Sequence, residues 1–290
     1  MAEHKNIVPT IVGMIPGLRV SLGLAGIFGA VLLVYFATSV MYAPLALPAT
    51  IGFALVAQLL FVRRWMLKLP SHEQQFQSLQ ATTNLVPMLG GAHLPLTDSA
   101  MEPVHQLHLV SHLLANRVDA VVECGSGTST LVVGNLLRQQ GHGHLYAIEQ
   151  DEAWSQLMQS VLVGQALNDY VTLLYAPLVP YGDLGSEENP GGLWYSTDVI
   201  QAALEGIQHI DLLVIDGPIG VNRYSRFPAL PYLAAKCDED TLIVLDDTNR
   251  QDERFVLERW QALFDLNVQH RTGAQRHQAH IRLAAPRQVK

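Results

Sequence analysis

Short apolar runs alternate with helical patterns from residue 118 onward, and this alternation constrains the fold more than any other feature of the chain. Strands that are apolar throughout and alternate with helices are typical of parallel sheets covered by helices on both faces. Two adjacent strand-like runs at the end predict an antiparallel edge. We expect strands at 118–124, 144–149, 171–177, 211–216, 241–247, 267–273 and 277–283, helices at 128–140, 151–167 and 253–264, and a partly helical stretch at 226–236. The pattern predicts a doubly wound, mostly parallel α/β sheet.

Acidic residues stand at the carboxyl ends of four of the five expected core strands. They are Glu123, Glu149, Asp216 and the pair Asp246–Asp247. A single acid at such a position is often a helix cap or a turn residue. Ligands of doubly wound sheets bind at the carboxyl ends of the strands, so the recurrence of acids there indicates a binding site.

The loop after the first strand reads Glu123-Cys-Gly125-Ser-Gly127-Thr-Ser-Thr130. Glycines at this place allow a tight turn and a close approach of a ligand to the backbone, and the following helix offers free N–H groups. A plain strand-to-helix turn is the alternative. A nicotinamide cofactor favours a third glycine where Thr130 stands, and a buried Glu123 suits a ligand with a cationic amine better than a pyrophosphate. An NAD-dependent oxidoreductase and a non-catalytic membrane scaffold are therefore kept as alternative hypotheses, ranked below the class of cofactor-dependent enzyme whose motif the loop resembles.

The pattern Glu123-x-Gly125-x-Gly127-x-Ser129 resembles the first motif of class I S-adenosylmethionine-dependent methyltransferases, without a third glycine. The resemblance implies a Rossmann-like fold and S-adenosylmethionine as cofactor. Glu149, 22 residues after Gly127, is placed to accept hydrogen bonds from a ribose diol. The implied cofactor-binding residues are Glu123, Gly125, Ser126, Gly127, Ser129, Glu149, Gln150, Ala176 and Asp216, with Gln150 and Ala176 flanking the adenine.

Asp216, Asp246 and Asp247 end neighbouring strands, so the fold would bring three carboxylates together. Such a cluster is costly unless a cation neutralises it, and oxygen ligands suit Mg²⁺. The arrangement resembles the metal-dependent O-methyltransferases of the catechol and macrolide-sugar types, which implies a catalytic role for Asp216 and Asp247 and a metal held by all three aspartates. The alternative is that Asp216 touches only the cofactor and Asp247 caps a helix. In the loop after Asp216, Arg223, Tyr224 and Arg226 are either substrate-positioning residues or solvated ones.

Two uncharged apolar runs, at 20–43 and 45–62, precede the α/β region. Runs of this length predict two transmembrane helices, and Pro44 and Pro48 would break a single long helix between them. Basic residues flank the pair on the outside, and none lies between the runs, which predicts a hairpin with both termini and the C-terminal domain in the cytoplasm. A signal peptide and a buried hairpin are the alternatives. The expected organisation is a membrane hairpin at 1–68, a connector at 69–100 and a Rossmann-like methyltransferase domain at 101–290.

The net charge and the cysteine count limit the classes of ligand and partner that we expect for this chain. The formal net charge of −8 disfavours a nucleic-acid substrate, and two cysteines far apart predict neither a zinc site nor a disulfide framework. The resemblance to the O-methyltransferases implies methyl transfer to a hydroxyl oxygen, and the predicted membrane hairpin suggests a small-molecule, glycan or lipid-linked acceptor at the membrane. A homo-oligomer is possible. The long segment 178–198 is expected to form a lid or a substrate wall, or to be disordered.

Overall fold

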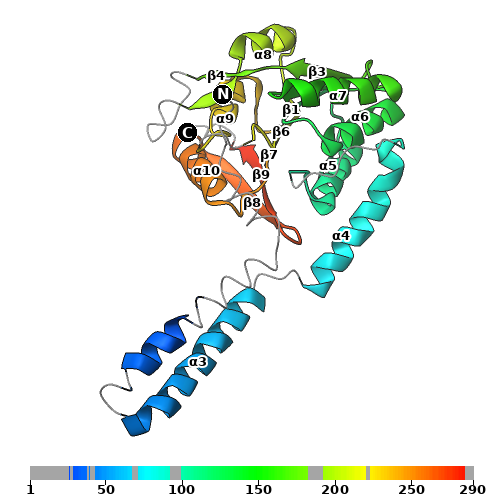
Figure 1. The fold of residues 1–290 in the computed structure, drawn as a ribbon. Coiled ribbons are helices and arrows are strands. Elements are labelled where there is room, and N and C mark those ends of the chain that lie inside the picture. Colours follow the sequence, from blue (N-terminus) through cyan, green and yellow to red (C-terminus); the bar gives the residue numbers. More distant parts are fainter. Residues whose placement is uncertain are drawn as a thin grey trace, which may run out of the picture. The chain divides into compact units, whose positions relative to one another are not determined.

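The computed structural model describes residue 26, residues 29–37, residue 39 and residues 43–66, 71–91, 99–181, 192–219 and 223–284. Two compact units make up the chain, Met1–Pro70 and Ser71–Lys290. Figure 1 shows the elements of both units in the order of the sequence.

A seven-stranded sheet forms the centre of the larger unit. Its strands are β1 (Ala120–Cys124), β2 (His144–Glu149), β3 (Val171–Tyr175), β6 (Leu212–Ile215), β7 (Leu242–Leu245), β8 (Leu266–Thr272) and β9 (His277–Leu283). They lie in the order β3-β2-β1-β6-β7-β9-β8 (Figure 1). The first five of this order are parallel to one another, and β9 runs antiparallel to both β7 and β8. The predicted mostly parallel sheet with an antiparallel edge is confirmed.

Successive residues of the central strands point to opposite faces of the sheet, which gives two apolar cores. Val121 belongs to the core on one face and Val122 to the core on the other. The first core is closed by α4 (His72–Leu85), η1 (Val86–Leu89), α5 (Pro103–Ala115), α6 (Thr128–Gln140) and α7 (Glu152–Gly164). The second is closed by α8 (Thr197–Leu204), α9 (Ala229–Leu233), η3 (Ala234–Lys236) and α10 (Gln251–Leu263). The central parallel strands β1, β6 and β7 are therefore buried on both sides, as their continuous apolar runs predict, whereas β3 at the edge of the sheet is only partly buried.

Two segments differ from the expectations. Helix α4 occupies part of the expected connector, and a capping box between Ser71 and Gln74 starts it. Segment 178–198 begins and ends in a small antiparallel pair, β4 (Leu178–Pro180) and β5 (Leu193–Tyr195), and runs into α8. Residues 182–191, where a lid was expected, lie outside the described residues. Periodicity missed these elements because α4 is weakly apolar and the β4–β5 pair is only three residues long.

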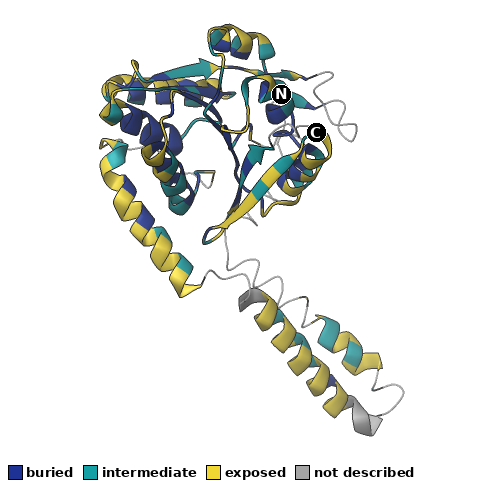
Figure 2. Cartoon of the chain, turned by 180° about the vertical axis from the view of Figure 1, so that it is seen from behind, coloured by how far each residue is buried: buried dark blue, intermediate teal, exposed yellow. Residues whose placement is uncertain are grey.

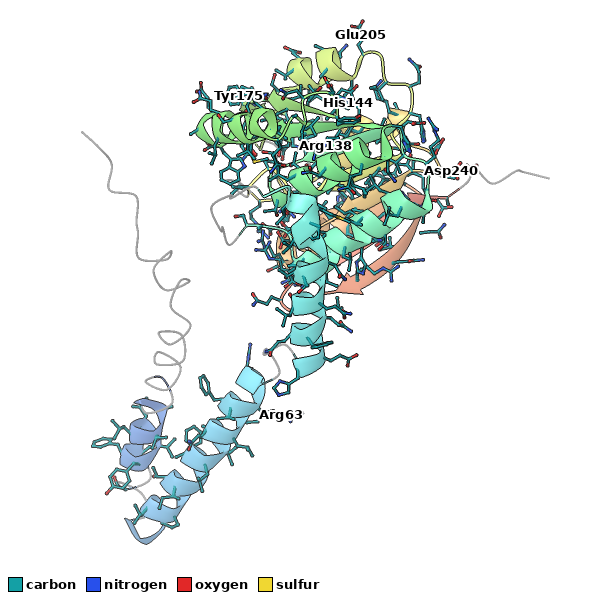
Figure 3. The ribbon with its side chains drawn as sticks, turned by 90° about the vertical axis from the view of Figure 1, so that its right-hand side faces the viewer. Arg63, Arg138, His144, Tyr175, Glu205 and Asp240 are labelled. Atoms are coloured by element: carbon teal, nitrogen blue, oxygen red, sulfur yellow. The ribbon has the colours of Figure 1, made fainter. Side chains whose placement is uncertain are left out.

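The smaller unit contains α3 (Ala43–Met66), which includes the second expected span. It begins before Pro44 and carries Pro48 early in the helix, so the expected break lies at its start. Within α3, Leu47–Arg64 is long and apolar enough to cross a membrane by length and composition, and it is the one such helix among the described residues. Its side chains are largely exposed (Figure 2), and Arg63 stands in its last turn (Figure 3). Half of the first expected span, 20–43, lies outside the described residues, and the described stretch 29–37 is helical.

Candidate functional site

The loop between β1 and α6 turns at Gly125, and the backbone leaves no room for a side chain there. Gly125 has a φ of +93°, and a Cβ at this position would lie 3.0 Å from the backbone nitrogen of Gly217. Gly217 belongs to the loop that follows β6. Two neighbouring strand ends therefore approach each other closely enough that only glycine fits at Gly125. Gly127 is different: a Cβ there would meet nothing within 4 Å, and its backbone faces open space.

Glu123 lies beneath this loop and is 1% exposed. Its two carboxylate oxygens accept hydrogen bonds from the hydroxyls of Ser129 and Thr130, at 2.5 and 2.6 Å. Burial raises the pKa of Glu123 to about 7, against the opposite effect of these two hydrogen bonds, and the nearby Glu149 raises it further. In the structure Glu123 thus ties β1 to the first turn of α6, and it does not line the cavity described below.

Glu149 ends β2 and is held by four hydrogen bonds. Its Oε2 accepts from the backbone N–H and the hydroxyl of Ser126, at 3.2 and 2.8 Å. Its Oε1 accepts from the backbone N–H groups of Gln150 and Asp151, at 2.8 and 2.9 Å. Asp151 in turn caps α7 by accepting from the N–H of Trp154. The β2–α7 turn therefore fixes a carboxylate beside the glycine loop, where the sequence predicts a ribose-binding residue.

A cavity of about 470 Å³ opens at the carboxyl ends of β1, β2 and β6. Seven of the predicted cofactor-binding residues line it: Gly125, Ser126, Gly127, Ser129, Glu149, Gln150 and Asp216. The other two do not, because Glu123 is bonded to α6 and Ala176 is fully buried after β3. The side chain of Gln150 presents an Oε1 that is buried and has no hydrogen-bond partner among the described residues.

The walls of this cavity include apolar residues that the sequence did not mark as part of a site. They are Met101, Trp154, Leu157 and Ile219. Trp154 is fixed by a hydrogen bond from its indole N–H to the carbonyl of Ser126, at 3.0 Å. Apolar positions in α7 indicate a helix that packs on the core, so periodicity alone does not distinguish the cavity wall from the core face.

The three predicted aspartates meet at the ends of β6 and β7. Each offers a carboxylate oxygen, and these oxygens lie within 4.8 Å of one another. Only Asp216 lines the cavity; Asp246 and Asp247 are 0% and 1% exposed behind it. Burial raises the pKa of Asp216 well above its usual range, with Asp246 acting in the same direction and Arg226 against it. The fold thus assembles the cluster that the strand ends predict.

Arginine side chains already contact this cluster. Arg226, from the loop after β6, approaches Asp216 and Asp247 at 3.2 and 3.1 Å. Arg250 and Arg276 approach Asp247 at 3.0 and 3.1 Å. The two oxygens of Asp247 are therefore shared among three guanidinium groups. Asp246 differs from Asp247, because its Oδ2 is buried and has no hydrogen-bond partner among the described residues.

Of the loop residues singled out in the sequence, Arg226 is buried in the cluster and Tyr224 stacks on Phe255 of α10 with ring centroids 4.0 Å apart. Arg223 contacts Asp252 at 3.3 Å and is exposed. His105 of α5 was not predicted as a site residue; its Nδ1 lies 3.2 Å from Asp246 Oδ1, and both side chains are fully buried. No sequence pattern indicates that His105 belongs to the site, because α5, the helix that carries it, is far along the chain from the aspartates.

Comparison with known proteins gives one match at the level of sequence families. Residues 122–248 match the model of a family described as a methyltransferase domain. No curated protein matches the sequence.

Several solved structures resemble the chain. The SAH-bound methyltransferase PaMTH1 of Podospora anserina shares 14% identity, covering 74% of this chain and 98% of its own, with a TM-score of 0.49. The O-methyltransferase of Bacillus cereus in complex with SAH shares 15%, covering 74% and 92%, with a TM-score of 0.46. The O-methyltransferase TomG of Streptomyces achromogenes in complex with SAM shares 14%, covering 78% and 95%, with a TM-score of 0.45.

The family match spans the glycine loop, Glu149 and all three aspartates. Residues 122–248, which contain most of the cavity lining, are therefore similar to a methyltransferase domain.

Proposed function

We propose that this chain transfers a methyl group from S-adenosylmethionine to a hydroxyl oxygen of a small-molecule, glycan or lipid-linked acceptor at a membrane. The observation that carries the proposal is the fixed carboxylate of Glu149 in a cavity that also contains the glycine loop and the start of α6. The hydroxyls of a ribose diol would donate hydrogen bonds to Glu149, and one of them would replace the hydrogen bond from the Ser126 hydroxyl.

The rest of the cavity suits the other parts of the cofactor. The apolar wall with Trp154 and Leu157 supports packing of an adenine ring. The unpartnered Oε1 of Gln150 is an acceptor for the exocyclic amino group of adenine. Gly125 and Asp216 would then face the methionine end, where the open space at Gly127 leaves room for the backbone to approach it.

Methyl transfer needs the acceptor oxygen in line with the sulfonium and a group that takes or holds the hydroxyl proton. Asp216 is the member of the aspartate cluster that lines the cavity, so it is our candidate for this catalytic role. Its raised pKa makes the carboxylate a better proton acceptor. Asp247 is withdrawn from the cavity and paired with arginines, which supports a role in positioning for that residue.

The membrane part of the proposal rests on α3. Its large apolar side chains are exposed, among them Leu55 at 62%, Leu59 at 68% and Leu60 at 57%. A helix with this much exposed apolar surface is suited to lipid. Arg63 and Arg64 in its last turn favour the cytoplasmic side for the chain that follows. This orientation would place the catalytic unit where S-adenosylmethionine is available.

The test is thermal unfolding of the full chain in detergent with S-adenosylmethionine, S-adenosylhomocysteine or NADH. A ligand that binds only the folded state raises the midpoint temperature. We expect both adenosyl ligands to raise it and NADH to leave it unchanged. A rise with NADH alone would favour the oxidoreductase hypothesis, and no rise with any of them would favour a non-catalytic scaffold.

A further inference from the structure

A guanidinium group lies between two of the three carboxylates of the aspartate cluster, those of Asp216 and Asp247. The side chain of Arg226 is 5% exposed, and its Nη2 lies 3.2 Å from Asp216 Oδ1 and 3.1 Å from Asp247 Oδ2. Its Nε lies 3.8 Å from Glu253 Oε1. Burial acts against the charge of Arg226, but the surrounding carboxylates outweigh it and raise its pKa. A permanent positive charge is therefore built into the cluster.

The backbone holds this guanidinium in place. Nη1 donates to the carbonyl of Asp246, at 2.9 Å, and Nη2 donates to the carbonyl of Asp216, at 2.7 Å. These carbonyls belong to the ends of two neighbouring strands, β6 and β7. Arg226 thus joins the two strand ends as well as the two side chains, and moving it would leave buried carbonyl groups without these donors.

The charges of the cluster are almost balanced by protein side chains. Three carboxylates, those of Asp216, Asp247 and Glu253, contact three guanidinium groups, those of Arg226, Arg250 and Arg276. The fourth, that of Asp246, lies 3.2 Å from His105 Nδ1, and its Oδ2 has no hydrogen-bond partner among the described residues. A divalent cation bound by Asp216 and Asp247 would have to displace the buried guanidinium of Arg226 from these carboxylates. Leaving such a charge without its partners is strongly unfavourable.

We propose that Arg226 takes the place of a divalent cation in this aspartate cluster, so that the chain binds no Mg²⁺ there and Arg226 acts as the positioning residue for Asp216. The statement about metal binding is independent of the proposed function; the statement about positioning rests on it. The two have separate readouts.

The first experiment titrates Mn²⁺, as a probe for Mg²⁺ sites, into the full chain in detergent, with the electron paramagnetic resonance signal of free Mn²⁺ as the readout. When protein and Mn²⁺ are present at equal concentrations, we expect the signal of free Mn²⁺ to equal that of a control without protein. Loss of signal at one ion per chain that Asp247→Asn reverses would overturn the proposal. Neither S-adenosylmethionine nor a methyl acceptor is needed, so failure of the proposed function leaves this result interpretable.

The second experiment compares Arg226→Met with Arg250→Met. Both variants remove a guanidinium from Asp247, but Arg250 is 48% exposed and, within the described part of the chain, makes no hydrogen bond to the strand-end carbonyls that Arg226 contacts. We expect Arg226→Met either to gain Mn²⁺ binding or to lower the thermal midpoint well below that of Arg250→Met. If Arg226→Met does neither, the proposal is wrong. If it does not fold, Arg226→Lys, which keeps the charge, is expected to fold and to show no Mn²⁺ binding; Mn²⁺ binding by that variant would contradict us.

The positioning role has its own readout. Asp216 lines the cavity and is held by Arg226, so Arg226→Lys is expected to weaken binding of S-adenosylmethionine more than Arg250→Met does. Chelation with EDTA is expected to leave binding to the wild-type chain unchanged. Equal affinities in the two variants would remove the positioning role and leave the metal result standing.

Discussion

Replacement of Glu123 by glutamine is expected to stabilise the protein in a pH-dependent way. Glu123 is 1% exposed, and its pKa is raised from 4.5 to about 7, chiefly by burial. Folding therefore favours the protonated form. At about 1.4 kcal/mol for each pKa unit, the ionised form is penalised by about 3 kcal/mol in the folded state. A glutamine side chain is close in shape to that of glutamate and carries no charge, so the variant escapes this penalty.

The sign follows from which state binds more protons. Below pH 4.5 both states carry a protonated Glu123, so the wild type and Glu123→Gln are expected to have similar free energies of unfolding. Between pH 4.5 and about 7 the unfolded chain loses the proton first, and the wild type becomes less stable as the pH rises. Above that window the variant is expected to be more stable by up to about 3 kcal/mol.

The assay is denaturant unfolding of the full chain in detergent, followed by tryptophan fluorescence between pH 4.5 and pH 8. The difference between variant and wild type is the quantity of interest, because the other titrating groups cancel in it. A second variant, Ser129→Ala, removes a hydrogen bond that lowers the pKa of Glu123 and is expected to move the window to higher pH. A difference that does not change with pH, or a wild type that is the more stable at pH 8, would refute the reasoning.

Three further predictions test local features. Gly125→Ala places a Cβ 3.0 Å from the Gly217 backbone at a φ of +93° and is expected to lower the free energy of unfolding by about 1–3 kcal/mol. Gly127→Ala meets nothing within 4 Å and should keep the wild-type stability; equal unfolding curves for the two alanine variants would contradict us. Ser71→Ala removes the capping box of α4 and is expected to cost about 1 kcal/mol in denaturant unfolding, whereas no change would mean that the cap contributes nothing. Tyr195→Phe removes a buried hydroxyl that has no partner among the described residues, so its stability should not fall; a loss above about 1 kcal/mol would reveal a partner for that hydroxyl.

The sequence predicts the sheet well because its strands carry strong and unambiguous signals. Strands β2 and β9 and helix α6 have the predicted bounds. Continuous apolar runs can only be buried between two helical layers. Parallel pairing then places all strand ends on one edge, so the meeting of Glu149, Asp216 and Asp247 near that edge follows from the topology.

The finer parts of the site depend on contacts that the local sequence does not specify. Arg226 lies in a loop, and nothing near it in the sequence indicates that it folds back onto the ends of β6 and β7. Glu123 stands at a strand end like Glu149, yet it bonds to α6 while Glu149 faces the cavity. Glu123 pairs in register with Ala147, two residues before Glu149, so it lies deeper in the sheet, where the hydroxyls of Ser129 and Thr130 bind it.

The most direct test of the central claim is calorimetric titration of the full chain with S-adenosylmethionine, comparing the wild type with Glu149→Gln. Glu152→Gln is the matched control, because Glu152 is the exposed glutamate in the first turn of α7 and does not line the cavity. We predict binding by the wild type and by Glu152→Gln, and an affinity at least about tenfold lower for Glu149→Gln, since a charged acceptor of ribose hydroxyls is lost. Equal affinity in all three proteins, or no binding by the wild type, would contradict the account.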